Sequence, residues 1–100
     1  MVQATTPTFI LTVPNTGDLS SAAHVYFTMT QKELIITKSG SQLTVSSHQV
    51  QVYLTQAETL QFKPGQAVIQ LNWTYSTGQR ACTKKVTINV EDNLLKKVVL

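Results

Sequence analysis

The sequence predicts an all-β sandwich, and three observations carry this prediction. Apolar and polar residues alternate with a period of two along several stretches, as in strands with one face in a core and one in solvent. β-branched Thr, Val and Ile dominate these stretches, and such side chains suit a pleated sheet. Turn signals separate the stretches at short, regular spacing, which favours an antiparallel β-sandwich of about seven strands.

The alternation assigns one face of each main stretch to the core. The residues expected on that face are Phe9, Leu11 and Val13; Val25, Phe27 and Met29; Val50, Val52 and Leu54; Ala67, Ile69, Leu71, Trp73 and Tyr75; and Val86, Ile88 and Val90. Two shorter stretches, 34–37 and 43–45, complete the count. Trp73 lies in the longest stretch, so we expect it to be a central core residue.

Turn residues punctuate these strands. Residues 14–18 contain Pro, Asn and Gly and end the first strand, and Pro64 and Gly65 open the long strand. Residues 39–41 predict a hairpin between 34–37 and 43–45. Residues 76–79 predict a second hairpin, between the long strand and the last one.

One segment near residues 55–60 departs from the strand pattern. Thr55 and Glu58 have the spacing of a capping box, in which each side chain bonds the other residue's backbone N–H. We expect one helical turn here that crosses from one sheet to the other, with Leu60 filling the core.

The chain is long enough for one domain, which we assign to residues 1–100 with tails at 1–6 and 93–100. Charged residues make up only 13% of the chain, so Thr, Ser and Gln supply most polar positions. The first residues lack the basic start and apolar run of a signal peptide, and no stretch reaches the length of a membrane span. We therefore expect a protein that is synthesised in the cytoplasm and does not associate with a membrane.

Residues with catalytic or metal-binding chemistry are few and scattered. Cys82 is the single cysteine, so an intrachain disulfide is impossible, and its spacing from Val86 predicts a small buried core residue. His24 and His48 each begin a strand and are expected at the surface or rim. We expect no enzyme activity, no cofactor and no metal site.

The net charge of +3 is a mild excess. A nucleic-acid contact would use Lys84, Lys85, Lys96 and Lys97, but these form two separate pairs and are not gathered in one stretch. Nucleic acid is therefore not the favoured partner.

Two features suggest a partner interface. Tyr26 and Tyr53 share parity with polar neighbours, so they should face outward, either as interface or carbohydrate contacts or as ordinary cross-strand pairs. The apolar residues of the C-terminal tail follow the last clear strand and could form an extra strand or dock on a neighbouring subunit. The interface residues that we expect are Tyr26, Tyr53, Leu94, Leu95, Val98 and Val99.

Several runs together carry a resemblance over nearly the whole chain. They are residues 54–62 (LTQAETLQF), Pro64-Gly65, 70–75 (QLNWTY), 78–80 (GQR), 7–9 (PTF) and 93–99 (NLLKKVV). These runs resemble short proteins encoded near tail-fibre and baseplate genes in prophages of Gram-positive gut anaerobes. The pattern is also similar to the immunoglobulin-like (Ig-like) sandwiches of phage tails, including the N-terminal domain of baseplate upper proteins. The chain lacks the paired cysteines of antibody domains, so that disulfide framework is excluded.

The resemblance implies a non-enzymatic structural or assembly protein. We expect it to pack on a phage tail, baseplate or fibre component, or on a second copy of itself, and to become part of the virion. The alternative is a carbohydrate-binding module that recognises the host cell surface, which would need two or three exposed aromatic side chains in one platform.

Overall fold

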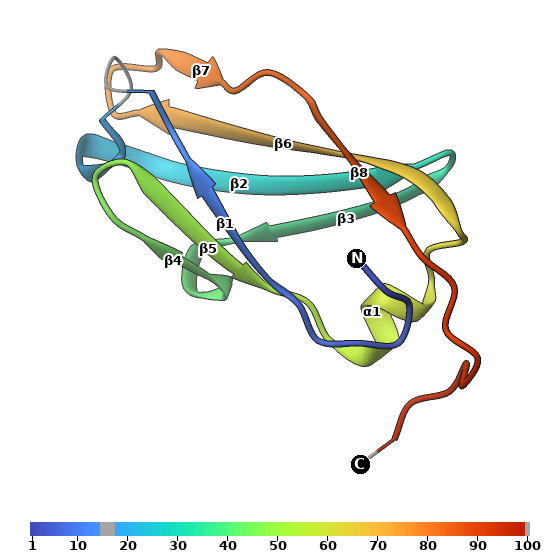
Figure 1. Ribbon diagram of the computed structural model, residues 1–100. Helices are drawn as coiled ribbons and strands as arrows, with labels where there is room; N and C mark the ends of the chain where they lie inside the picture. Colours follow the sequence, from blue (N-terminus) through green and yellow to red (C-terminus); the bar gives the residue numbers. More distant parts are fainter. Residues whose placement is uncertain (15–17, 100) are drawn as a thin grey trace.

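Two antiparallel sheets face each other across one core in the computed structural model, which describes residues 1–14 and 18–99 (Figure 1). The smaller sheet has the order β1 (Thr8–Thr12), β5 (Gln49–Tyr53), β4 (Leu43–Val45). The larger sheet has the order β3 (Leu34–Ser39), β2 (Ala22–Gln31), β6 (Gly65–Tyr75), β7 (Arg80–Cys82), and β8 (Val86–Val90) also pairs with β6. The mostly β, sandwich-like architecture that the alternation predicts is confirmed.

The strand β8 follows β7 along the same edge of β6. β7 pairs with residues 72–74 of β6 and β8 pairs with residues 65–69, both on the side of β6 away from β2. The two are thus one edge strand interrupted at residues 83–85. This explains why the sequence predicts about seven strands where the described residues form eight.

In the described part of the chain, three short helical segments connect the strands. The 3-10 helix η1 (Leu19–Ser21) precedes β2, η2 (Gly40–Gln42) lies between β3 and β4, and the α-helix α1 (Gln56–Leu60) follows β5. The capping box of α1 is confirmed, because the Thr55 hydroxyl accepts from the Glu58 N–H and the Glu58 carboxylate accepts from the Thr55 N–H. Of the turn expected at 14–18, residues 15–17 lie outside the described part of the chain.

The predicted hairpin between 34–37 and 43–45 is wrong. β3 belongs to the five-stranded sheet and β4 to the three-stranded one, so η2 carries the chain between the layers. The hairpin that β3 does form is with β2, through a turn at Lys32 and Glu33 in which Lys32 has a φ of 53°. Neither turn residue is Gly, Asn or Pro, so the residue types at 32–33 do not predict this turn. The second predicted hairpin, from the long strand to the last one, turns where expected, and Gly78 there has a φ of 88°, but the strand it enters is β7. The last strand, β8, pairs with β6 further along the same edge.

Most residues that the alternation assigns to the core are buried or partly buried, but Val86, at the start of the edge strand β8, is 47% exposed, which corrects its assignment. Trp73 is buried, as are Phe27, Met29, Val50 and Leu71. Leu60 was expected to fill the core, but it is only half-buried, and the neighbouring Thr59 and Phe62 are fully buried instead. The Thr59 hydroxyl is satisfied there because it donates to the Thr5 carbonyl at 2.8 Å.

Cys82 is exposed, which corrects the prediction of a buried residue. It pairs with Asn72, whereas Val86 pairs with Ile69, so the register between β6 and its neighbours shifts by one residue across 83–85. A shift of one residue moves a side chain to the opposite face of a sheet. Counting alternate residues back from Val86 ignores this shift, and it therefore places Cys82 on the core-facing side of the sheet, which is the wrong one.

The N-terminal segment, expected to be a tail, is bound to the end of β8. Val2 forms an isolated parallel bridge with Glu91, and the Gln3 N–H donates to the Glu91 carbonyl at 3.0 Å. Gln3 is buried, and its side-chain Nε2 donates to the Phe62 carbonyl at 2.5 Å. Residues 1–5 thus help to close one end of the sandwich.

Candidate interaction surfaces

The two tyrosines singled out from the sequence lie on opposite faces of the molecule. Both are exposed, Tyr26 at 37% and Tyr53 at 51%. Tyr26 lies on β2 of the larger sheet and Tyr53 on β5 of the smaller sheet, and each faces away from the core. The structure therefore does not bring them together in one platform.

The outer face of the smaller sheet is exposed and entirely uncharged. In register from β1 to β5, Thr8 lies beside Tyr53, Ile10 beside Gln51 and Thr12 beside Gln49, and Thr44 of β4 lies on the other side of Gln51. Ile10 is 58% exposed in the middle of β1, an edge strand of this sheet. We call this surface the small-sheet face; it is a flat array of hydroxyl, amide and apolar groups.

The outer face of the larger sheet gathers polar side chains around Tyr26. The rings of His24 and Tyr26 lie 6.3 Å apart, and Asn72 is in register with Tyr26 on the neighbouring strand. The Arg80 guanidinium donates to the Asn72 side-chain oxygen at 3.1 Å, which holds the cation against the sheet. His24, Tyr26 and Arg80 thus share one corner of this face.

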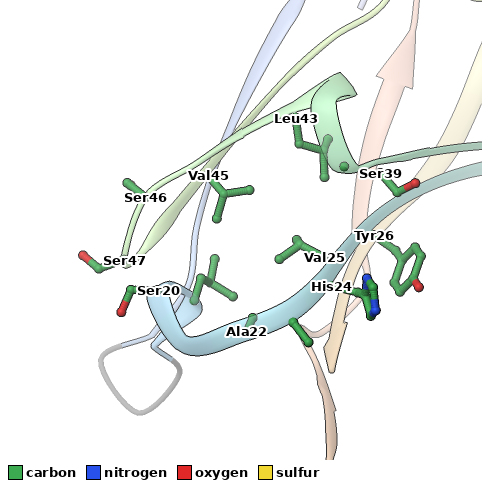
Figure 2. A pocket seen from close by; sticks show the side chains of 13 residues that line it. Ser20, Ala22, His24, Val25, Tyr26, Ser39, Leu43, Val45, Ser46 and Ser47 are labelled. Atoms are coloured by element: carbon green, nitrogen blue, oxygen red, sulfur yellow. The ribbon is translucent and has the colours of Figure 1, made fainter. Parts of the chain in front are cut away.

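A groove of about 490 Å³ opens between β2 and β4 (Figure 2). β2 pairs with β3 only from Tyr26 onward, so Ala22–Val25 have β6 on one side and no strand on the other within the described chain. Val25, Leu43 and Val45 point into the hollow in Figure 2, and Ser46 and Ser47 lie at its rim. The groove exists because the chain leaves the larger sheet at η2 and enters the smaller one.

A second groove follows the opposite seam of the sandwich, between β1 and the interrupted strand β7–β8. It consists of two hollows of about 570 Å³ and about 190 Å³ that share Thr12, Thr83 and Val86 in their walls. Trp73 lies in the larger hollow and Leu71 in the smaller one. The walls are mainly apolar, with Lys84 as the one charged residue among those that line them.

The described part of the C-terminal tail, residues 93–99, forms neither strand nor helix, and Leu100 lies outside the described chain. Leu94 is 99% exposed, and Leu95, Val98 and Val99 are also exposed. The Gln56 side chain holds the end of this segment, because it both donates to the Val99 carbonyl and accepts from the Val99 N–H. The C-terminal tail therefore ends beside α1, the helix that follows β5 and its last residue, Tyr53 (Figure 1).

Charge is almost absent from the strands. Of the eight basic and five acidic residues, Lys38 and Arg80 are the two that lie in strands of the described chain. Lys38 faces inward and pairs with Glu58, with 2.6 Å between Nζ and the nearer carboxylate oxygen. Lys96 pairs with Asp92 at 3.0 Å in the tail. Apart from Arg80, the surface charges lie outside the strands of the described chain, and the basic pairs 84–85 and 96–97 follow different strands.

Two carboxyl groups have pKa values below their usual range. Asp18 is the N-cap of η1, and its carboxylate accepts hydrogen bonds from the Ser20 hydroxyl and N–H, which lower its pKa. For Glu58, partial burial tends to raise the pKa, but hydrogen bonds from Lys38 and Thr55 lower it by more. The hydrogen bonds that lower these two pKa values are contacts within the fold, so the lowered values do not indicate a functional site.

Within residues 1–14 and 18–99, no three His, Cys, Asp or Glu side chains gather closely enough to hold a metal ion. The same residues include no helix with the length and hydrophobicity needed to cross a membrane. Comparison of the chain with protein-family models, with curated proteins and with solved structures finds no match.

Sequence reasoning missed both grooves. Their walls are core-parity residues at the ends of sheets, such as Val25 and Trp73, and alternation alone does not show where two sheets fail to meet. The signal that could have been used is the short length of 43–45 beside the long stretch 67–75. A three-residue strand cannot cover an eleven-residue one.

Proposed function

We propose that this protein is a non-enzymatic structural or assembly protein that packs on a phage tail, baseplate or fibre component. The observation that carries the proposal is the exposed apolar segment of Leu94, Leu95, Val98 and Val99. A contiguous exposed apolar segment on a soluble protein marks a protein or membrane interaction site. The phage context comes from the resemblance of the sequence to prophage-encoded tail-region proteins, and the Ig-like relationship is part of the same proposal.

The contact surface that we propose combines the tail with the small-sheet face. Tyr53 ends β5 just before α1, and Gln56 of α1 holds Val99 through two hydrogen bonds. Tyrosine is enriched at protein interfaces because it combines a large apolar ring with a polar hydroxyl. Tyr26, on the other sheet, would belong to a separate contact.

A carbohydrate-binding module is the less supported alternative. Such a module needs several exposed aromatic rings on one surface, and Tyr26 and Tyr53 face in opposite directions. A glycan array tests this alternative independently. Binding that is lost in Tyr26→Ala or Tyr53→Ala would favour it over the assembly role.

Co-purification of the tagged protein with phage tail proteins tests the proposal. The variant carries Leu94→Ser, Leu95→Ser, Val98→Ser and Val99→Ser. We expect the wild type to co-purify with tail, baseplate or fibre proteins, identified by mass spectrometry, and the variant to lose them.

The matched control is Ile35→Ser, which removes an isoleucine that is 64% exposed on β3 of the larger sheet. It should keep the partners of the wild type. Equal recovery of phage tail proteins by the wild type and by the variant with four serines would contradict the role given to the C-terminal segment.

A further inference from the structure

A strand at the edge of a sheet exposes backbone N–H and C=O groups that can pair with another chain. Natural sheets protect such edges with very short strands, bulges, lysines or inward-pointing charges. The edge strands of this sandwich differ in whether they carry such devices.

Most edges in the described chain are protected. β3 carries the inward-pointing charge of Lys38, and β4 has only three residues. The interrupted strand β7–β8 has a register shift and Lys84 and Lys85 at its break. The part of β2 that pairs on one side only, Ala22–Val25, has a register shift between Ala22 and His24.

β1 (Thr8–Thr12) carries none of these devices. Its sequence, TFILT, has no charge, no glycine and no proline, and it pairs with β5 in continuous register. Its central residue, Ile10, is exposed. β1 also borders the second groove, so a strand added at this edge would lie over Leu71 and Val86.

The backbone groups of β1 that face away from β5 can be identified. The Leu54 N–H donates to the Pro7 carbonyl, and the Val13 N–H donates to the His48 carbonyl. Hydrogen-bonded pairs alternate along an antiparallel ladder, so Phe9 and Leu11 bond β5. Thr8, Ile10 and Thr12 therefore direct their N–H and C=O groups outward.

We propose that β1 pairs antiparallel with β1 of a second copy of this chain, around a two-fold axis at Ile10. In this register Ile10 pairs with Ile10 of the partner copy, and Thr8 pairs with Thr12 in both directions. All three are hydrogen-bonded pairs, so every outward N–H and C=O of the strand finds a partner. The two small-sheet faces then form one continuous uncharged surface.

A second copy fits this edge because the edge is complementary to itself. Two molecules with a net charge of +3 each would repel one another, but β1 and the sheet that it borders carry no charge. Threonine pairs across strands stabilise antiparallel sheets. The proposal concerns the backbone edge of β1, not the tail or the outer face of the sheet, so it goes beyond the proposed function, and solution mass tests it without any phage protein.

Solution mass tests the proposal first. Sedimentation of the wild type from about 1 μM to about 1 mM should show a shift from 11.0 kDa toward twice that mass. Ile10→Lys should remain a monomer over the whole range, and Ile35→Lys, an equivalent change on the protected strand β3, should dimerise as the wild type does. A wild type that stays monomeric, or an Ile10→Lys variant that dimerises equally, would overturn the proposal.

Amide hydrogen exchange on the wild type tests the register without any substitution. The amides of Thr8, Ile10 and Thr12 should exchange fast at low concentration and slowly at high concentration. Those of Phe9 and Leu11 should be protected at both, because they bond β5. A dimer in which the three outward amides exchange at their monomer rate would refute β1 pairing.

Discussion

Lys38 Nζ lies 2.6 Å from Glu58 Oε2 and 2.8 Å from Oε1, in a contact that joins the edge strand β3 to the helix α1. Lys38 is on the core-facing side of β3, in register with the fully buried Phe27. Its ammonium therefore needs a partner, since an unpaired charge at a buried position is costly. Glu58 meets this need and also accepts from the Thr55 N–H, so one carboxylate caps α1 and neutralises the lysine.

Replacement of Lys38 by Met should lower the free energy of unfolding by about 1–3 kcal/mol, because Glu58 keeps a partly buried charge without its partner. Denaturant unfolding measures this change. Lys63→Met, at an exposed lysine, should change the stability by less than about 0.5 kcal/mol. Equal effects of the two substitutions would mean that the ion pair contributes nothing to stability.

The stability of the protein should fall in acid in a way that depends on Glu58. Burial raises its pKa, but the hydrogen bonds from Lys38 and Thr55 hold it below the ordinary value of about 4.3 that the unfolded chain has. The folded state thus binds this proton less readily. The stabilisation is complete above the unfolded-state pKa and is lost as the pH falls through the folded-state pKa.

Unfolding curves measured between pH 7 and pH 3 test this dependence. Glu58→Gln removes the titrating group, so its loss of stability in acid should be smaller than that of the wild type. Parallel pH profiles for the two proteins would argue against the linkage.

Phe62→Ala should be one of the most destabilising substitutions at the end of the sandwich that α1 covers. Phe62 is fully buried, so truncation should cost about 3–5 kcal/mol. Leu60→Ala should cost about 1 kcal/mol, because Leu60 is only half-buried. Thermal and denaturant unfolding of the two variants compare them directly, and the reverse order would restore Leu60 as the core residue.

The thiol of Cys82 should react with a thiol reagent in the folded protein at a rate close to that in denaturant. The reason is that Cys82 is exposed on the outer face of β7. Cys82→Ser provides the background. Labelling that occurs only after unfolding would show that Cys82 faces the core.

Removal of residues 94–100 should separate folding from partner binding. Leu94 makes almost no contact with the rest of the chain, so the free energy of unfolding should change by less than about 1 kcal/mol. The truncated chain should still dimerise through β1 but should no longer co-purify with phage tail proteins. A truncated chain that fails to fold would show that the tail is part of the domain.

The sequence predicted the strand faces well because burial alternates wherever a strand has one face in the core. Phe27, Met29, Val52 and Trp73 are buried as expected, and the capping box at Thr55 forms as expected. These features depend on local spacing alone. The exposure of Tyr26 and Tyr53 follows from the same rule.

The features that the sequence did not predict depend on how the sheets are assembled. A one-residue register shift turned Cys82 outward, and the passage of η2 between the layers separated β3 from β4. Both decide which edges are left open, and alternation carries no information about partners across a sheet. The grooves and the unprotected edge of β1 therefore became visible only in the assembled fold.

The central claim is that this chain is a component of phage tail assembly, and mass spectrometry of purified assemblies tests it most directly. Particles and tail precursors would be isolated after induction of a strain that encodes the chain, and cross-linked before digestion. The account predicts that the chain is present in a fixed ratio to tail or baseplate proteins, with cross-links from Lys96 or Lys97 to one of them. Absence of the chain from both particles and precursors, while it is abundant in the same lysate, would contradict the account.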